Sequence, residues 1–179
     1  MSYDKELARQ IYNTARITGE FLLRSGATSH QYFDKYLFEA NPTLLKQIAE
    51  AMASNLPDDD IDVLAGLEMG GIPIVTMLSQ TTGLPGLFVR KKAKEYGTCK
   101  LAEGGEINGR KLVIIEDVVT SGGQILLSAA DLRARGAIID TVLCVIDREA
   151  GGKEKLAADG LELRPLFTMS QLEAAAQSA

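Results

Sequence analysis

The sequence predicts an α/β fold: a mostly parallel, twisted β-sheet with helices on both faces. Short apolar runs that suit buried strands alternate along the chain with segments of helical periodicity. This alternation is typical of parallel sheets that helices cover on both sides. The chain has 179 residues, of which 46% are hydrophobic and 24% charged, and no repeat or linker divides it. We therefore expect a single domain, residues 1–179, with a sizeable core.

The first part of the chain, residues 1–60, is less regular than the rest. Apolar residues near helical spacing predict a helix over 4–17. Residues 21–26 and 32–38 are expected to be short extended segments. Pro42 should begin a second helix, because proline suits the first helical position. We expect this part and the C-terminal segment to form a small hood over the carboxyl ends of the strands.

The remaining residues give the regular alternation. Strands are expected at 62–67, 86–89, 111–115, 138–146 and 161–166. Helices are expected at 72–80, 124–135, 153–158 and from Ser170 onwards. Residues 62–148 should form the ligand-binding core.

Bulk properties exclude several classes of protein. A net charge of −5 argues against a general nucleic-acid surface. No apolar run approaches the ~20 residues of a membrane span. The first residues are charged and unlike a signal peptide. Two cysteines, Cys99 and Cys144, do not suggest a disulfide framework, so we expect a cytoplasmic protein.

The most informative stretch is residues 111–124. An apolar strand ends at the carboxylates Glu116 and Asp117, and a turn of small residues, 120–123, then opens a helix. Such a turn binds anions through unpaired amides and the helix dipole. The carboxylates would repel phosphate but suit hydroxyls or a divalent cation. A ribose that carries a 5-phosphate and is bound with a metal ion would supply the anion, the hydroxyls and the cation together. An ordinary acidic turn is the alternative, and no Walker or dinucleotide-binding pattern competes.

A long connection, residues 92–109, has no periodicity of its own. Connections longer than about 12–15 residues are usually functional or disordered. It follows the basic residues Arg90 and Lys91 and contains Lys94, Gly97 and the pair 104–105. Basic groups between glycine hinges suit a lid that closes on an anionic substrate. A solvated basic loop is the alternative.

Two further segments lie where strands end. In residues 66–73, glycines allow close backbone approach to a ligand, and the following helix N-terminus favours an anion. A tight turn is the alternative. Arg148 follows the strand at 138–146, and its planar guanidinium suits a carboxylate. Taken alone, an arginine here favours a surface role, but its position after a core strand, at the same sheet edge as Asp117, favours the site.

Together these motifs resemble the type I phosphoribosyltransferases, and among them the orotate phosphoribosyltransferases. The resemblance runs from about Phe21 to Arg148. The stretch 111–124 is similar to the signature for phosphoribosyl pyrophosphate (PRPP), and 66–73 to the pyrophosphate loop. Arg-Lys-x-x-Lys-x-Tyr-Gly at 90–97 resembles the catalytic loop, and Phe-Leu-Leu-Arg-Ser-Gly at 21–26 the N-terminal substrate segment. The resemblance implies the type I phosphoribosyltransferase fold, with a hood and a long flexible catalytic loop.

The resemblance also implies an activity: orotate and PRPP give orotidine 5′-monophosphate and pyrophosphate, in pyrimidine (UMP) biosynthesis. It implies catalytic roles for Arg90, Lys91, Lys94 and Asp117. It implies PRPP contacts from Met69, Gly70, Arg90, Lys91, Lys94, Tyr96, Glu116, Asp117, Val118, Val119, Thr120, Ser121, Gly122, Gly123 and Gln124. It implies orotate contacts from Arg24, Tyr32, Phe33, Thr120 and Arg148. Mg²⁺ would be held mainly through PRPP and water, with no direct protein ligand.

In the family the catalytic loop reaches the neighbouring subunit's site, which implies a homodimer. This chain departs from the family pattern at three positions. Tyr96 stands where better-known bacterial members have His, Gly70 where some relatives have Lys, and Arg24 where Lys is usual. The alternatives are a purine phosphoribosyltransferase and a PRPP-binding regulator on the same fold.

Overall fold

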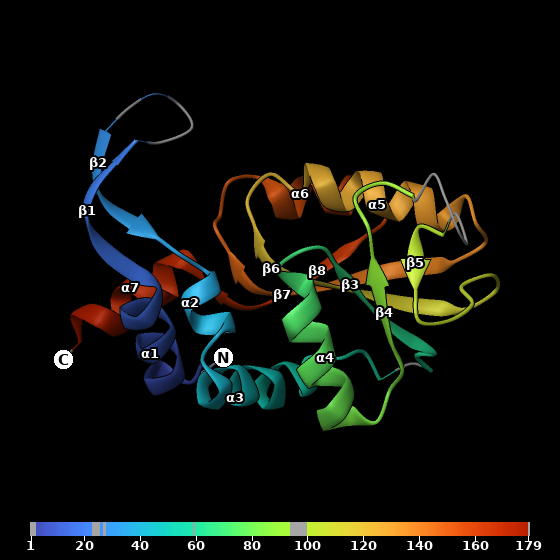
Figure 1. Ribbon diagram of the computed structural model, residues 1–179, viewed down its shortest axis with the longest axis horizontal. Coiled ribbons are helices and arrows are strands. Elements are labelled where there is room, and N and C mark those ends of the chain that lie inside the picture. Colours follow the sequence, from blue (N-terminus) through green and yellow to red (C-terminus); the bar gives the residue numbers. More distant parts are fainter. Residues whose placement is uncertain (1–2, 23–25, 27, 59, 94–99, 179) are drawn as a thin grey trace.

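The computed structural model describes residues 3–22, 26, 28–58, 60–93 and 100–178. Its centre is a six-stranded sheet in the order β5-β4-β3-β6-β7-β8 (Figure 1). The strands are β3 (Val63–Leu67), β4 (Gly86–Val89), β5 (Ala102–Glu103), β6 (Lys111–Val119), β7 (Ile138–Asp147) and β8 (Glu162–Thr168). All neighbouring pairs in this sheet are parallel except β4 and β5. This arrangement confirms the predicted fold class.

Helices cover both faces of the sheet (Figure 1). On one face lie α3 (Pro42–Ala53) and α4 (Gly71–Thr82), and on the other α5 (Gly123–Arg133) and α6 (Gly152–Ala158). Successive side chains of a strand point to opposite faces. Accordingly Val113 and Ile115 join the core beneath α3 and α4, whereas Leu112 and Ile114 join the core beneath α5. Because β6 is buried on both faces, its first half has a continuous apolar sequence.

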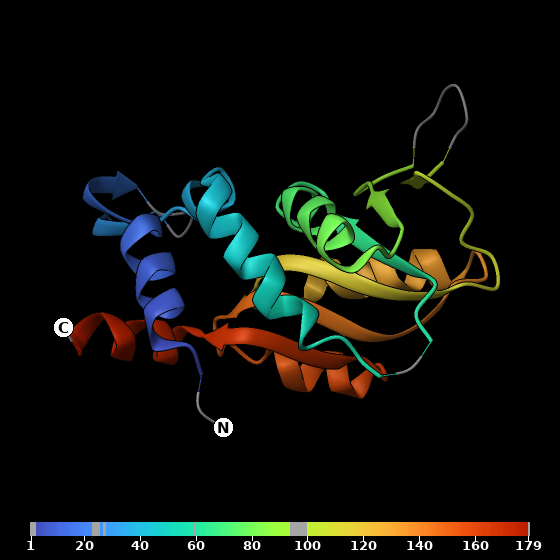
Figure 2. The ribbon, with the colours of Figure 1, turned by 90° about the horizontal axis from the view of Figure 1, so that it is seen from below.

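The hood combines both ends of the chain. It contains α1 (Lys5–Ala15), β1 (Arg16–Leu22), β2 (Thr28–Phe33), α2 (Tyr36–Glu39) and α7 (Met169–Gln177). The antiparallel pair β1–β2 projects from the body of the molecule, and α1 lies against α7 (Figures 1 and 2). The Tyr3 hydroxyl donates to the Gln171 carbonyl at 3.2 Å, and the Tyr3 ring meets Phe167 edge-on at 6.1 Å. The two terminal segments therefore build this region jointly.

Three elements differ from the sequence prediction. β6 continues to Val119 because it keeps pairing with β7, so Glu116 and Asp117 lie inside the strand. Residues 36–39 are helical, and a four-residue helix is too short to leave a periodic pattern. Residues 102–103 of the predicted structureless connection form β5, which adds to the edge strand β4. A two-residue strand likewise leaves no alternation in the sequence.

No helix in the described part of the chain is both long and apolar enough to cross a membrane. The cytoplasmic location expected from the sequence stays a prediction.

Candidate active site

A small cradle forms where β6 runs into α5. Its volume is about 190 Å³. It is lined by Glu116, Val118, Val119, Thr120, Ser121, Gly122, Gly123, Gln124 and Ile125. Gly122 precedes α5 with φ of +70°, a left-handed conformation that glycine adopts without strain. The turn thus presents the N-terminus of an 11-residue helix to the cradle, which favours an anionic group.

Glu116 is the carboxyl group that lines this cradle. Its Oε1 accepts a hydrogen bond from the Asp117 backbone N–H at 3.0 Å. Burial, and then the neighbouring charge of Asp117, raise the pKa of Glu116 well above its usual value. A carboxyl group accepts hydrogen bonds from hydroxyls, and in its protonated form it also donates one. Glu116 therefore suits a ligand hydroxyl beside the phosphate position.

Asp117 points away from the cradle and is almost completely enclosed, with 1% of its side chain exposed. Its Oδ1 accepts the Val118 backbone N–H at 2.5 Å, and its Oδ2 forms an ion pair with Lys35. Gly70 closes over it: a Cβ atom at Gly70 would lie 1.5 Å from Asp117 Oδ2. The predicted pyrophosphate loop thus packs directly on the second carboxylate.

Arg148 sits beside the start of the cradle. Its backbone N–H donates to the Val119 carbonyl at 2.9 Å, and its side chain is exposed. The next residue, Glu149, has φ of +57°, the left-handed conformation that non-glycine residues rarely adopt. The Glu149 carboxylate accepts the backbone N–H of Ser170 at 2.9 Å and its hydroxyl at 2.5 Å. The turn that carries Arg148 is therefore fixed on both sides, by β6 and by the first turn of α7.

The base of the predicted lid lies next to the pyrophosphate loop. Arg90 Nε donates to Glu103 Oε1 at 3.4 Å, and the Lys91 backbone N–H donates to Glu68 Oε1 at 2.5 Å. Glu68 and Arg90 also line a hollow of about 250 Å³. Three predicted lid residues, Lys94, Tyr96 and Gly97, lie outside the described residues. The exposed Met69 lies between Glu68 and Gly70.

The predicted base-binding residues lie in the hood. The Tyr32 ring packs 5.6 Å from Phe21, and the Phe33 ring packs 6.2 Å from Tyr12. Tyr32 keeps about half of its surface exposed, whereas Phe33 is partly buried. Arg24 lies outside the described residues. The structure therefore brings the cradle, Gly70 and Arg148 together, and it places Tyr32 and Phe33 in the neighbouring hairpin.

Sequence reasoning missed three residues here. Ile125 completes the cradle and is buried. Lys35, directly before α2, and Glu39, the last residue of α2, meet Asp117 from the hood side. Burial, followed by the charge of Asp117, raises the pKa of Glu39 to about 8. The only sequence signal for Lys35 and Glu39 was that they come within five residues after Tyr32-Phe33-Asp34.

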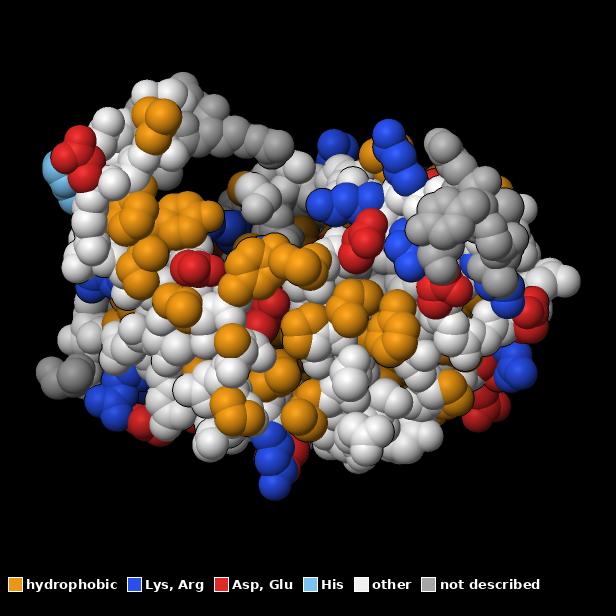
Figure 3. All heavy atoms as spheres, in the orientation of Figure 1, with side chains coloured by type: hydrophobic (Ala, Val, Ile, Leu, Met, Phe, Trp, Pro, Cys, Tyr) orange, Lys and Arg blue, Asp and Glu red, His pale blue; other side chains and the backbone are white. Residues whose placement is uncertain are grey.

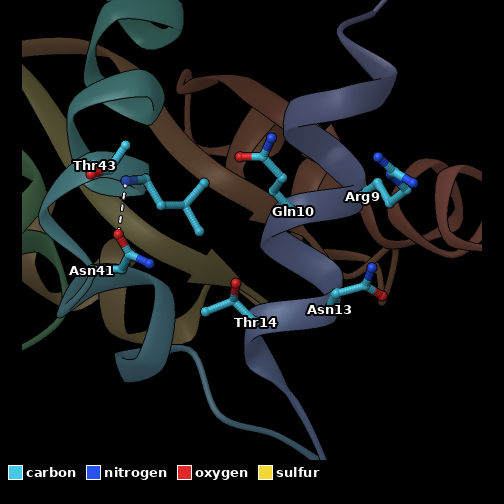
Figure 4. Close-up of a pocket in the computed structure, with 7 residues that line it drawn as sticks. Arg9, Gln10, Asn13, Thr14, Asn41 and Thr43 are labelled. Carbon is cyan, nitrogen blue, oxygen red and sulfur yellow. Dashed lines mark hydrogen bonds between the residues drawn. The ribbon is translucent and has the colours of Figure 1, made fainter.

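A larger hollow elsewhere contains none of the predicted site residues. It lies between α1 and α3 and has a volume of about 460 Å³ (Figure 4). Its lining is mostly polar and consists of Arg9, Gln10, Asn13, Thr14, Asn41, Thr43 and Leu44. Asn41 is already engaged there, because its Oδ1 accepts the Leu44 backbone N–H at 3.1 Å and caps α3.

The donor set of the cradle bears on metal binding. Across the described residues, no group of three or more His, Cys, Asp or Glu side chains is arranged to hold a metal ion. Mg²⁺ keeps several waters and often binds through substrate phosphates and only one or two carboxylates. The site therefore fits a Mg²⁺ ion carried mainly by a phosphorylated ligand better than a protein-built metal cage.

The comparisons with known proteins agree with this geometry. Residues 37–164 match the phosphoribosyl transferase domain family. An orotate phosphoribosyltransferase from a Nocardioides species is 53% identical over 178 residues, which cover 99% of each chain. The Mycobacterium tuberculosis orotate phosphoribosyltransferase in complex with Fe(III) dicitrate has a TM-score of 0.86 at 28% identity, covering 94% of this chain and 97% of that one. The same enzyme in complex with PRPP has a TM-score of 0.81 at 26% identity, covering 94% and 98%. The chain belongs to the phosphoribosyltransferase family and, within it, to the orotate phosphoribosyltransferases.

Proposed function

We propose that the protein transfers the phosphoribosyl group of PRPP to orotate, which yields orotidine 5′-monophosphate and pyrophosphate for pyrimidine synthesis. One observation carries the proposal. β6 delivers Glu116 and the turn 118–125 to a single cradle, in a chain 53% identical along its length to an orotate phosphoribosyltransferase. A structural neighbour of that name has been crystallised with PRPP.

The cradle would hold the ribose 5-phosphate. Backbone amides of the turn and the N-terminus of α5 suit its charge, and Thr120 and Ser121 add hydroxyl donors. Glu116 would form a direct hydrogen bond with a ribose hydroxyl. Asp117 would stabilise the positive charge that develops on the ribose ring as pyrophosphate leaves. Asp117 would act on the ribose through its charge, because Gly70 and Lys35 enclose the carboxylate.

Departure of pyrophosphate is the step that needs positive charge. Arg90 and Lys91 lie at the end of β4, beside the Gly70 loop, and Lys94 would follow them on the lid. Mg²⁺, bound mainly through PRPP and water, would neutralise further charge on the leaving group. Catalysis would then consist chiefly of positioning and electrostatic stabilisation.

Base selection would rest on Arg148. A guanidinium pairs with a carboxylate through two parallel hydrogen bonds, and orotate carries a carboxylate that purines and uracil lack. The exposed Arg148 side chain projects from a turn fixed against β6 and α7. Tyr32, Phe33 and Arg24 would complete the base site from the hood, and Thr120 from the cradle.

We further propose that the enzyme works as a homodimer with the lid shared between subunits. Hydrophobic side chains gather over the middle of one face, above α2, α4 and β4 (Figure 3). Large exposed hydrophobic residues on or beside these elements are Tyr36, Leu37, Met69 and Phe88. A contiguous apolar patch of this kind is typical of a protein interface.

The test is orotate consumption, followed by ultraviolet absorbance with PRPP and Mg²⁺, with adenine, hypoxanthine and uracil as competing bases. PRPP-dependent loss of orotate with release of pyrophosphate is the expected result. Turnover of a purine without turnover of orotate would overturn the base assignment and leave a purine phosphoribosyltransferase. PRPP binding without turnover of any base would instead favour a regulator.

A further inference from the structure

Helix α2 connects the hood to the PRPP motif through two charged side chains. Lys35, which precedes α2, forms the ion pair with Asp117 Oδ2. Glu39, at the end of α2, is 5% exposed, and its Oε1 has no hydrogen-bond partner among the described residues. Both groups therefore meet at the carboxylate against which Gly70 also packs.

Acidic groups outnumber basic groups around Asp117. Three carboxyl groups, Glu39, Glu116 and Asp117, share one ammonium group, Lys35. Burial alone would lower the pKa of Lys35, but its ion pair with Asp117 outweighs burial and raises that pKa. Glu39, with a pKa of about 8 and facing Asp117, Lys35 and Asp34, keeps its proton at neutral pH. Among the described residues of this cluster, Lys35 and Asp117 form the ion pair.

A pair of this kind is weak as a stabilising device. Desolvation of two charges can cost as much as their attraction returns, and apolar replacements are often neutral or stabilising. Strongly perturbed titratable groups in a cleft are instead candidates for a functional role. The position of Lys35 favours function, because its side chain keeps 32% exposure and contacts a residue of the PRPP motif.

We propose that Lys35, supported by Glu39, is a positioning residue that holds the Asp117 carboxylate in place beneath Gly70 at the ribose end of the site. This inference rests on the proposed function. Without the ammonium group, the enclosed Asp117 carboxylate loses its ion-pair partner and is no longer held in one orientation. This loss weakens PRPP binding and slows the step that develops positive charge. Orotate binding, which depends on Arg148, is affected much less.

The test compares Lys35→Met, Lys35→Arg and a control, Lys46→Met, whose lysine forms an exposed pair with Glu50 on α3. Steady-state kinetics give kcat and both KM values, and titration calorimetry gives PRPP affinity without turnover. For Lys35→Met we expect a PRPP affinity at least tenfold weaker and kcat/KM for PRPP about a hundredfold lower, with the KM for orotate within twofold. Lys35→Arg should recover most of the loss, and Lys46→Met should stay within twofold of wild type.

A double-mutant cycle with Asp117→Asn then tests whether the two residues act together. The double variant should be no worse than Asp117→Asn alone, because Lys35 acts through Asp117. If the losses of the two single variants multiplied in the double variant, the proposal would be overturned. A Lys35→Met variant with wild-type PRPP affinity and kcat, or one that differs from wild type only in melting temperature, would also overturn it. If Lys35→Met does not fold, the double variant, which leaves no unpaired charge, is compared with Asp117→Asn. A further tenfold loss there refutes the inference.

The proposed function can fail separately. Wild-type protein that binds PRPP but does not turn over orotate would refute the proposed function. The calorimetric comparison of Lys35→Met with wild type would still decide the role of Lys35.

Discussion

Gly70→Ala should disturb the site through one methyl group. The added Cβ would lie 1.5 Å from Oδ2 and 2.3 Å from Cγ of Asp117, whereas ordinary contacts begin near 3.4 Å. About 2 Å of movement is therefore needed. Asp117 cannot move freely, because Val118 and Lys35 hold its two oxygens. Either the Gly70 loop shifts or the ion pair breaks.

The cost follows from these two routes. Overpacking in a well-packed interior costs about 1–3 kcal/mol, and breaking a buried pair costs about 3–5 kcal/mol. We expect Gly70→Ala to lower the free energy of unfolding by about 2–4 kcal/mol, because shifting the loop costs less than breaking the ion pair. For a domain of this size each kcal/mol lowers the melting temperature by about 2–4 °C, which gives a total of roughly 5–15 °C. PRPP affinity should fall about tenfold or more, because the pyrophosphate loop and Asp117 are displaced together.

Scanning calorimetry and PRPP titration measure both effects. Gly86→Ala is the matched control, since its added Cβ would lie 3.6 Å from the nearest atom, Ser79 Cβ. The control should keep wild-type affinity and a melting temperature within about 2 °C. A Gly70→Ala variant with wild-type melting temperature and wild-type PRPP affinity would refute the packing argument.

Four further predictions concern neighbouring residues. Asp117→Asn should lose most of kcat while it stays folded, and a near wild-type rate in steady-state assays would contradict the assigned role. Mixing an Arg148→Ala variant with a Lys94→Ala variant should restore activity in hybrid dimers if the lid acts in trans; no recovery would indicate a lid in cis. The pKa of Glu39 is about 8 in the folded protein against an ordinary 4.5. Its contribution to the free energy of unfolding is therefore complete below about pH 4.5 and is lost as pH rises through 8. Urea unfolding at pH 5, 7 and 9 should therefore show the free energy of unfolding of Glu39→Gln rising relative to that of wild type as pH rises, by up to about 4 kcal/mol, and a parallel pH dependence would disprove this. Glu149→Ala removes the acceptor for Ser170, and it should raise the KM for orotate several-fold while PRPP affinity stays within twofold; unchanged orotate kinetics would exclude a role in holding Arg148.

The cradle could be predicted from the sequence because it is built from consecutive residues. An apolar run buried on both faces, two acids and a turn of small residues place Glu116 and residues 118–124 together through backbone geometry alone. The sheet and its covering helices follow from the same periodicity. Even the neighbourhood of Arg148 follows, because parallel strands β6 and β7 end at one edge.

The environment of Asp117 could not be predicted in this way. Its partners come from Gly70 and from Lys35 and Glu39, which are far from it in the sequence. The short helix α2 leaves no periodic signal, and a lysine and a glutamate in a polar stretch are indistinguishable from solvated surface residues. Only the packing of the hood against the sheet brings Lys35 and Glu39 to Asp117.

This difference has a functional consequence. The phosphate cradle is held by local backbone structure, so substitutions elsewhere should leave it largely intact. Asp117 is held by contacts between the hood and the sheet, and α2 begins three residues after Phe33 of the predicted base segment. A displacement of the hood would therefore reach Asp117 through Lys35 while the cradle stays in place. A displaced hood should therefore slow phosphoribosyl transfer more than it weakens binding of the 5-phosphate of PRPP.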